Sequence, residues 1–382
     1  MEKTKPERRS DLDWLRVLLI LSVFLFHSGR AFLPIPWHIN DSTGSSGMMY
    51  FAQFMLAWML PTIFIISGAS IWFSLGFQKA GRFLRGKVLR LLVPLVFGIF
   101  ILSPHQVYIE RLTNGQFSGS FIKWFPQYFE GVYGFGGNFA TVGLHLWYLF
   151  FLFIFSLILL PLFLYLRSDK GRPVTKAFGS FLRIPGMIYI LGLTLTVPMA
   201  FINPESFFGM REEFAGWNII YYISVLFFGF MFFSDKRIQE AIISQRWVSL
   251  IVGIVLYLMF RVFRISFRPS PFQLGWFHYV LSSWCLIMAI LGFGMKCLTG
   301  TGRFIRYSNE GVLPFYILHQ PVIVLIAFWV IQLQIPIVVK YIIIVILSFI
   351  AIIVLFEGIR RVGVLRFLFG MKVRRASASS QK

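Results

Sequence analysis

Acidic side chains and cysteine are scarce in this chain. Its 382 residues include 15 Asp and Glu against 36 Lys and Arg, and two cysteines, Cys285 and Cys297. Two cysteines twelve residues apart predict neither a disulfide framework nor a metal cluster. The sequence also contains no GxSxG elbow, no HExxH motif and no carboxylate pair of glycosidase character. Signatures of the serine hydrolases, zinc proteases and glycosidases are therefore absent, and we expect no metal site.

Hydrophobic residues dominate instead. They make up 57% of the chain against 13% charged residues, and the mean hydropathy is +0.75. Apolar runs of about twenty residues recur, the length that crosses the hydrocarbon core of a membrane. They predict ten spans, near residues 12–33, 49–76, 88–108, 144–166, 185–202, 217–233, 247–263, 276–296, 312–331 and 338–357. The sequence thus predicts an all-α integral membrane protein, a bundle of about ten transmembrane helices.

The first apolar run is expected to stay in the mature protein, because it holds charged groups and no clear small-residue cleavage site. A single polytopic membrane domain would then cover residues 1–370. The last segment, residues 371–382, is rich in Lys, Arg and Ser and is predicted to be a disordered basic tail.

The net charge of +21 follows the predicted topology. With the N-terminus inside, 27 of the 36 Lys and Arg residues fall on the inner side of the ten spans. This bias is the positive-inside rule and predicts that both termini are cytoplasmic, in a multi-pass protein of the plasma (inner) membrane. No segment outside the spans is long enough to form a water-exposed basic domain, so we expect no nucleic-acid partner.

Arg16 and His27 both lie inside the first predicted span. Eleven residues are about three helical turns, so the two side chains would point the same way, with Cα atoms roughly 16 Å apart along the axis. Ionisable groups inside a membrane helix are costly and mark functional sites by default. Asp13, three residues before Arg16, would lie beside it and could neutralise it.

The other histidines gather toward the outer ends of the spans. His38, His105, His145 and His278 fall there with His27, whereas His319 lies near mid-membrane. Imidazole is the side chain best suited to accept and return a proton near neutral pH. An interfacial cap is the simpler interpretation of His38, His105 and His278. His27 and His319 lie deeper, which favours a functional interpretation.

Two clusters of cations flank the spans. Arg261, Arg264 and Arg268 form one stripe on the outer side, suited to carboxylate, phosphate or sugar hydroxyls, or equally to lipid phosphates. On the inner side, the basic residues from Lys79 to Arg90 are sufficiently explained as a positive-inside anchor. A docking site for a polyphosphate donor is the sharper alternative, although no Gly-rich phosphate loop supports it.

Several of these residues resemble the motifs of a known family. Arg16-x10-His27 resembles the Arg/Lys-x10-His signature of the membrane acyltransferase-3 family, and Ile66-Ser67-Gly68 in the second span supports it. Lys87-Val88-Leu89-Arg90 is similar to the family's RxxR motif, with lysine in the first position. Blocks at 37–40, 145–149, 309–321 and 365–370 are similar to the branch of the family that succinylates periplasmic glucans.

The resemblance implies an O-acyltransferase. A succinyl or acetyl group would move from a cytoplasmic acyl-CoA-type donor to hydroxyls of an extracytoplasmic glucan or other envelope carbohydrate. Arg16 would meet the donor, and His27 would deprotonate a sugar hydroxyl or carry the acyl group transiently. His319 is the third catalytic candidate, and His319, Asn309 and Tyr316 are the candidate oxyanion donors. The predicted substrate-binding residues are Lys87, Arg90, His38, Asn40, His145, Trp147, Arg261, Arg264, Arg268, Asn309 and Tyr316.

No permanently bound cofactor is expected, since acyl-CoA would be a co-substrate. The expected partners are the lipid bilayer, the carbohydrate acceptor and the glycan-synthesis machinery. Two other functions stay open from the residues. One is a transporter of a sugar or acylated metabolite, in which the intramembrane Arg and His line a substrate or proton pathway. The other is a membrane subunit that recruits a polysaccharide synthase.

Overall fold

The structure, a computed structural model, describes residues 9–201, 219–266 and 274–372, which fold mostly into helices. Within these ranges there is no strand, and β-type pairing is limited to two isolated bridges, Val132 with Phe139 and Tyr133 with Gly137. The predicted all-α class is therefore confirmed. The predicted tail lies outside the described residues from residue 373 onward.

The chain divides into two compact units, each assembled from three segments. Unit 1 contains Met1–Leu19, Gln53–Ala80 and Phe155–Asn309, and unit 2 contains Ile20–Ala52, Gly81–Ile154 and Glu310–Lys382. Four long helices contribute residues to both units: α1 (Ser10–Gly29), α2 (Ser46–Phe77), α7 (Trp147–Arg167) and α14 (Arg303–Val330). A single domain over residues 1–370 stays a prediction.

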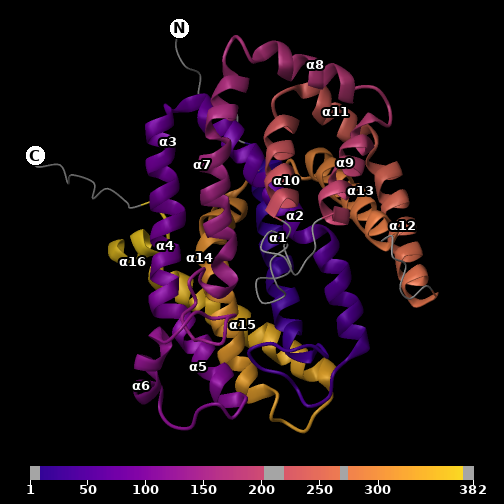
Figure 1. Cartoon of the computed structure of the whole chain (residues 1–382). Coiled ribbons are helices and arrows are strands. Elements are labelled where there is room, and N and C mark those ends of the chain that lie inside the picture. The colour runs from indigo at the N-terminus through magenta and orange to yellow at the C-terminus, as the bar shows by residue number, and fades with distance from the viewer. Residues whose placement is uncertain (1–8, 202–218, 267–273, 373–382) are drawn as a thin grey trace, which may run out of the picture. The chain divides into compact units, whose positions relative to one another are not determined.

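Unit 1 is a set of closely packed helices. Its other helices are α8 (Arg172–Leu182), α9 (Met187–Phe201), α10 (Ile219–Phe232), α11 (Lys236–Ser244), α12 (Arg246–Ser266) and α13 (Leu274–Cys297). Helix α13 packs along α12, and the two lie side by side in Figure 1. Small residues allow the close approach: Ser282 Oγ donates to Gly253 O at 2.9 Å, and a Cβ at Gly253 would lie 3.0 Å from Leu286 N. Gly and Ser at such contacts are typical of membrane helices.

Gly68 of the Ile66-Ser67-Gly68 motif lies where α2 crosses α10. A Cβ added at Gly68 would overlap Leu226 O, and one added at Gly229 would overlap Ile65 O. The two main chains are thus in direct contact, and each needs glycine at the crossing. This gives Gly68 a packing role that holds whatever else the motif does.

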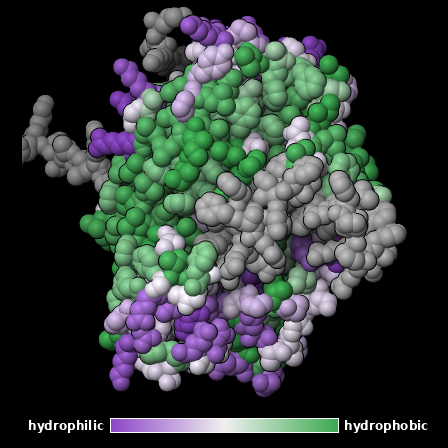
Figure 2. Space-filling view, in the orientation of Figure 1, coloured by the Kyte–Doolittle hydropathy of each residue, from purple (hydrophilic) through white to green (hydrophobic). Residues whose placement is uncertain are grey.

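Unit 2 contains one long span interrupted by two π-helical turns. Helices α3 (Ala80–Lys87), α4 (Val93–Phe97) and α5 (Ser103–Thr113) are joined by π-helical residues Val88–Leu92 and Gly98–Leu102, and form one column in Figure 1. The unit also contains α6 (Phe121–Trp124), α15 (Ile337–Ile359) and α16 (Gly363–Leu368). Figure 2 shows an apolar surface over α4, with hydrophilic residues below it around α6. Val96, Phe100 and Ile101 are exposed on that column, as expected of a surface that faces lipid.

The described residues contain seven helices long and apolar enough to cross a membrane, or up to nine if each bent helix pair is one span. The seven are Ser10–Phe32, Ser46–Phe77, Ala80–Thr113, Leu144–Arg167, Phe277–Cys297, Arg303–Val330 and Ile337–Ile359. The predicted spans 185–202 and 217–233 fall on α9 and α10, which bend by 106° against α8 and α11. The predicted span 247–263 falls on α12, whose apolar part is shorter. A multi-pass membrane protein is confirmed, whereas ten spans and cytoplasmic termini stay predictions.

The glycine-rich loop after α5 packs its aromatic residues inward. Trp124 and Tyr128 are fully buried in a small cluster with Val107 and Ala140. Tyr128 donates a hydrogen bond to Ile99 O at 2.7 Å, and burial raises the pKa of Tyr128 to about 12. These two rings are therefore part of a core.

Candidate active site

The two deepest histidines meet in unit 2. His27 on α1 and His319 on α14 are 292 residues apart in the chain, and His27 Nδ1 lies 3.0 Å from His319 Nε2. Their ring centroids are 4.9 Å apart. His319 is fully buried, whereas His27 is half-buried. The structure thus brings together two of the three predicted catalytic residues.

Carbonyl groups determine which nitrogen of each neutral ring carries the proton. His319 Nδ1 lies 2.5 Å from Tyr316 O, and since a carbonyl only accepts, Nδ1 must donate. His319 Nε2 is then the acceptor for His27 Nδ1–H, which also lies 3.1 Å from Val23 O. The lone pair of His27 therefore resides on Nε2. A histidine held in this way presents Nε2 as a base.

His145 is the third imidazole of the cluster. Its ring centroid lies 5.1 Å from that of His319, and its Nε2–H donates to Ile317 O at 3.0 Å. That carbonyl is free to accept because Pro321, four residues on, has no N–H with which to continue the helix. His145 Nδ1 is buried and has no hydrogen-bond partner. Its lone pair is therefore a second one in unit 2 besides that of His27 Nε2.

The backbone before His145 is held in an unusual conformation. Gly143 and Leu144 have φ angles of +73° and +54°, and Leu144 is a non-glycine residue in the left-handed region. The Tyr316 hydroxyl donates to His145 O and so fixes the same turn. This contact occupies the Tyr316 hydroxyl hydrogen, which sequence reasoning had considered for an oxyanion. Strained backbone of this kind clusters at functional sites.

His38 is held at both ring nitrogens. Its Nδ1 lies 2.5 Å from Glu110 Oε2, and its Nε2 lies 3.1 Å from Gln320 Nε2, which must donate. Gln320 Nε2 also donates to Gln106 Oε1 at 3.0 Å. Gln320 directly follows His319, so this chain of hydrogen bonds ties α14 beside the histidine pair to α5.

Glu110 is the centre of that network. Besides His38, its carboxylate accepts from Tyr133 Oη at 2.7 Å and from Arg111 Nη1 at 3.0 Å. Sequence reasoning missed Glu110, Gln106 and Gln320. A carboxylate near the end of an apolar span was the available signal, because carboxylates are scarce in this chain.

The predicted acceptor residue Asn40 shapes the loop that follows α1. Its Oδ1 accepts from Trp37 N at 2.9 Å, and its Nδ2 donates to Ile35 O at 2.9 Å. The next residue, Asp41, is paired with Lys340 at 2.5 Å. Burial tends to raise the pKa of the Asp41 carboxyl, but hydrogen bonds from Lys340 and Thr43 hold it below its usual value.

The remaining predicted residues of unit 2 are Trp147, Lys87 and Arg90. Trp147 is buried at the start of α7. Lys87 and Arg90 lie at the junction of α3 with the first π-helical turn, and Lys87 Nζ lies 5.3 Å from the Phe83 ring centroid. Arg90 is exposed.

Arg16 belongs to unit 1. It bonds Asp13 Oδ1 at 2.8 Å, which confirms the predicted i,i+3 pair, and donates to Ser70 Oγ of α2 at 2.8 Å. Ser70 Oγ in turn donates to Ile66 O at 2.6 Å, so the guanidinium is held against the motif segment of α2. A cavity shared by Arg16 and His27 stays a prediction.

The outer arginine stripe and Asn309 also belong to unit 1. Arg261 donates a hydrogen bond to Gln53 on α2. The side chain of Arg264, and Arg268 as a whole, lie outside the described residues. Asn309 is half-buried on α14. In the part of the chain that the structure describes, no group of three or more His, Cys, Asp or Glu side chains is placed to hold a metal ion.

The apolar spans define a multi-pass membrane protein, and the hydrogen-bonded pair of His27 and His319 gives it a candidate site for proton transfer. A family model described as "Acyltransferase domain" matches residues 9–357, nearly the whole chain. The chain therefore belongs to the acyltransferase-3 family, and it is an acyltransferase.

Among curated proteins, the chain is similar to Glucans biosynthesis protein C of Salmonella paratyphi B and of Salmonella dublin. Each is 23% identical over 200 residues, which are 50% of this chain and 49% of the relative. The match thus spans about half the length of these relatives. No solved structure matches the chain.

Proposed function

We propose that this protein is a membrane O-acyltransferase that moves a succinyl or acetyl group from an acyl-CoA-type thioester to a hydroxyl of an extracytoplasmic glucan or other envelope carbohydrate. The hydrogen bond between His27 and His319 is the observation that carries the proposal, because it leaves His27 Nε2 as a base. The names of the relatives support a glucan as the acceptor.

The proposed reaction uses His27 as general base and then as general acid. The acceptor hydroxyl gives its proton to His27 Nε2 as its oxygen attacks the thioester carbonyl. The tetrahedral oxyanion then collapses, the C–S bond breaks, and the departing thiolate takes the proton back from the imidazolium. The products are a carbohydrate ester and a free thiol.

His319 supports this proton transfer without touching the substrate. Its Nε2 accepts from His27 Nδ1–H, and this bond becomes charge-assisted when His27 is an imidazolium. We assign His319 as a positioning residue that orients the ring of His27 and stabilises its protonated form. Helix α14 is anchored next to His319 by Gln320, which donates to His38, and His38 in turn bonds Glu110.

Arg16, Lys87 and Arg90 are proposed to bind the donor from the cytoplasmic side. The support is their match to the family motifs and their place on the inner side of the predicted spans. Donor and acceptor would then approach from opposite sides of the inner membrane.

Purified protein in proteoliposomes would test this proposal with succinyl-CoA or acetyl-CoA and glucan oligosaccharides, with the product measured by mass spectrometry. His27→Gln should lower acyl transfer by about 10²–10⁴-fold, the usual contribution of a general base. His105→Gln is the matched control, because His105 is an exposed histidine of the same unit. Full activity of folded His27→Gln would refute the assignment, as would movement of unmodified sugar with no thioester consumed.

Mass spectrometry of envelope glycans from cells with and without the protein would identify the substrates. A mass increment on one glycan, lost in the His27→Gln strain, would name both the acyl group and the acceptor. No change in any envelope glycan would contradict the proposed acceptor class.

A further inference from the structure

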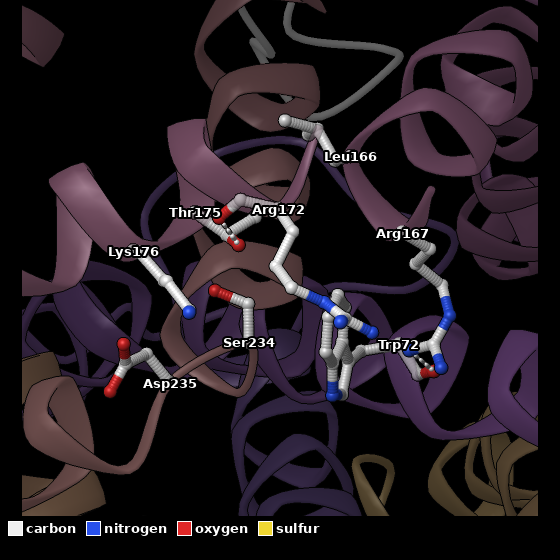
Figure 3. Close-up of a pocket in the computed structure, with 8 residues that line it drawn as sticks. All are labelled: Trp72, Leu166, Arg167, Arg172, Thr175, Lys176, Ser234 and Asp235. Carbon is white, nitrogen blue, oxygen red and sulfur yellow. Dashed lines mark hydrogen bonds between the residues drawn. The ribbon is translucent and has the colours of Figure 1, made fainter. Parts of the chain in front are cut away.

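Unit 1 contains a polar cavity at the end of α7, and all of its lining residues belong to unit 1. Its volume is about 290 Å³, and eight residues from α2, α7, α8 and the turn before α11 line it (Figure 3). Three of the eight are cations, Arg167, Arg172 and Lys176, and one is a carboxylate, Asp235. Sequence reasoning had assigned these cations only to the general positive-inside bias.

Arg167 is fixed in place at one wall of the cavity. Its Nη1 donates to Trp72 O at 2.9 Å, and its guanidinium carbon lies 4.1 Å from the Trp72 ring centroid. Trp72 packs edge-on against Phe230 at 5.0 Å. Gly76 leaves room for the arginine, since a Cβ there would lie 3.0 Å from Arg167 Nη2. A guanidinium stacked on an aromatic ring keeps most of its donors for other acceptors.

The other two cations come from one face of α8. Arg172 and Lys176 are four residues apart, and in Figure 3 Arg172 extends toward Trp72 while Lys176 extends toward Asp235. Arg172 forms one ion pair, 3.6 Å from the fully exposed side chain of Asp169. Such an exposed pair is weak, so Arg172 can turn to another anion at little cost.

Asp235 does not cancel the charge of the cavity. Its Oδ2 accepts from Arg237 Nη2 at 2.7 Å, and its Oδ1 accepts from Arg237 N at 2.9 Å, as the N-cap of α11. The carboxylate is thus already neutralised by an arginine outside the lining. The hydroxyls of Thr175 and Ser234 complete a polar wall.

The size and charge of the cavity select its ligand. At about 290 Å³ it lies at the lower end of ligand sites, which fits one anionic group with a small substituent. Three cations that approach from two helices, α7 and α8, suit a tetrahedral group with at least three acceptor oxygens better than a planar carboxylate. We propose that this cavity binds the phosphate group of a phosphate ester, held by Arg167, Arg172 and Lys176.

Two sources can present that group, a phospholipid headgroup or a soluble phosphate ester. Helix α8 meets α9 at 106° and exposes Val174 and Phe181, seven residues apart, beside its cations. This pattern is typical of a helix that lies in the membrane interface. It places the cavity where a lipid phosphate would be within reach, and the test must separate the two sources.

The test measures the thermal midpoint of the full-length protein in a neutral detergent at constant ionic strength. The probes are glycerol 3-phosphate, mixed micelles with phosphatidylglycerol, and succinate as a carboxylate of similar size. The variants are the double substitution Arg172→Gln with Lys176→Gln, and the matched control Arg183→Gln, which removes an exposed charge just after α8. The two substituted residues are exposed, so the double variant should fold.

We expect a phosphate probe to raise the thermal midpoint of the wild type and of Arg183→Gln by a few degrees. The double variant should bind the same probe about tenfold more weakly. A rise with glycerol 3-phosphate supports a soluble ligand, and a rise with phosphatidylglycerol alone supports a lipid. No rise with either phosphate probe, an equal rise with succinate, or an unchanged rise in the double variant would overturn the proposal. None of these outcomes depends on acyl transfer.

Discussion

Replacing His319 by leucine would remove one of the two acceptors near His27 Nδ1–H, His319 Nε2 at 3.0 Å, and leave only Val23 O at 3.1 Å. A hydrogen bond to a charged group contributes about 1.5–3 kcal/mol. Since His27 becomes an imidazolium only as the acceptor hydroxyl loses its proton, most of that energy would be lost from the transition state. We therefore expect kcat to fall roughly 10- to 150-fold, with little change in KM.

His319→Gln separates the hydrogen bond from the imidazole ring. The amide oxygen can accept from His27 Nδ1–H while the amide N–H donates to Tyr316 O, so the tautomer of His27 is preserved. Its kcat should stay within about tenfold of the wild type.

The assay for both variants is single-turnover acyl transfer in proteoliposomes, with thermal unfolding as the check on folding. His319→Leu activity within threefold of the wild type would refute the reasoning. Equal losses in the leucine and glutamine variants would show that the ring does more than accept one hydrogen bond.

Three further predictions concern stability. Gly68→Ala should destabilise unit 1 by about 1–3 kcal/mol or more, because its Cβ would overlap the main chain of α10. Glu110→Ala should cost about 3 kcal/mol, since it leaves the buried Nδ1 of His38 without its carboxylate partner. Asp41→Asn should cost a similar amount by breaking the pair with Lys340. The folded pKa of Asp41 is lowered, so the contribution of its carboxylate to stability is present above the unfolded pKa, 3.8, and is lost as pH falls through the folded pKa. Below about pH 5, the stability of the wild type should therefore drop more than that of Asp41→Asn.

Thermal or denaturant unfolding checks each of these variants against a matched control. Gly302→Ala has open space around its Cβ, and Glu130→Ala removes an exposed carboxylate, so both should be near neutral. Losses in a control as large as in its partner would contradict the packing and pairing arguments. A parallel loss of wild-type and Asp41→Asn stability on acidification would contradict the pH argument.

The positions of the helices could be predicted well from sequence. Within the described residues, each of the ten predicted spans falls on helix, because the length and apolarity of a span are local properties. The pair of Asp13 and Arg16 was predictable for the same reason, since one helical turn brings them together. The π-helical turns at Val88–Leu92 and Gly98–Leu102 were not predicted, since no hydrophobic period marks an extra residue in a turn.

The candidate site was predictable only in part. His27 and His319 were identified separately as ionisable groups deep in apolar spans. A hydropathy pattern does not predict that two side chains 292 residues apart will meet. Glu110 and Gln320 were missed because their role depends on partners from other helices. The buried Trp124 and Tyr128 show the same limit, since composition alone cannot separate a surface aromatic from a core one.

Sequence by itself determined that this chain is a helical membrane protein with an acyltransferase motif, because the bilayer sets the length and apolarity of each span locally. Only the tertiary structure decided that His27 Nδ1 meets a second imidazole. That contact joins His27 to His319, whose own Nδ1–H is held by Tyr316 O, and it forms through the packing of helices that are distant in the chain.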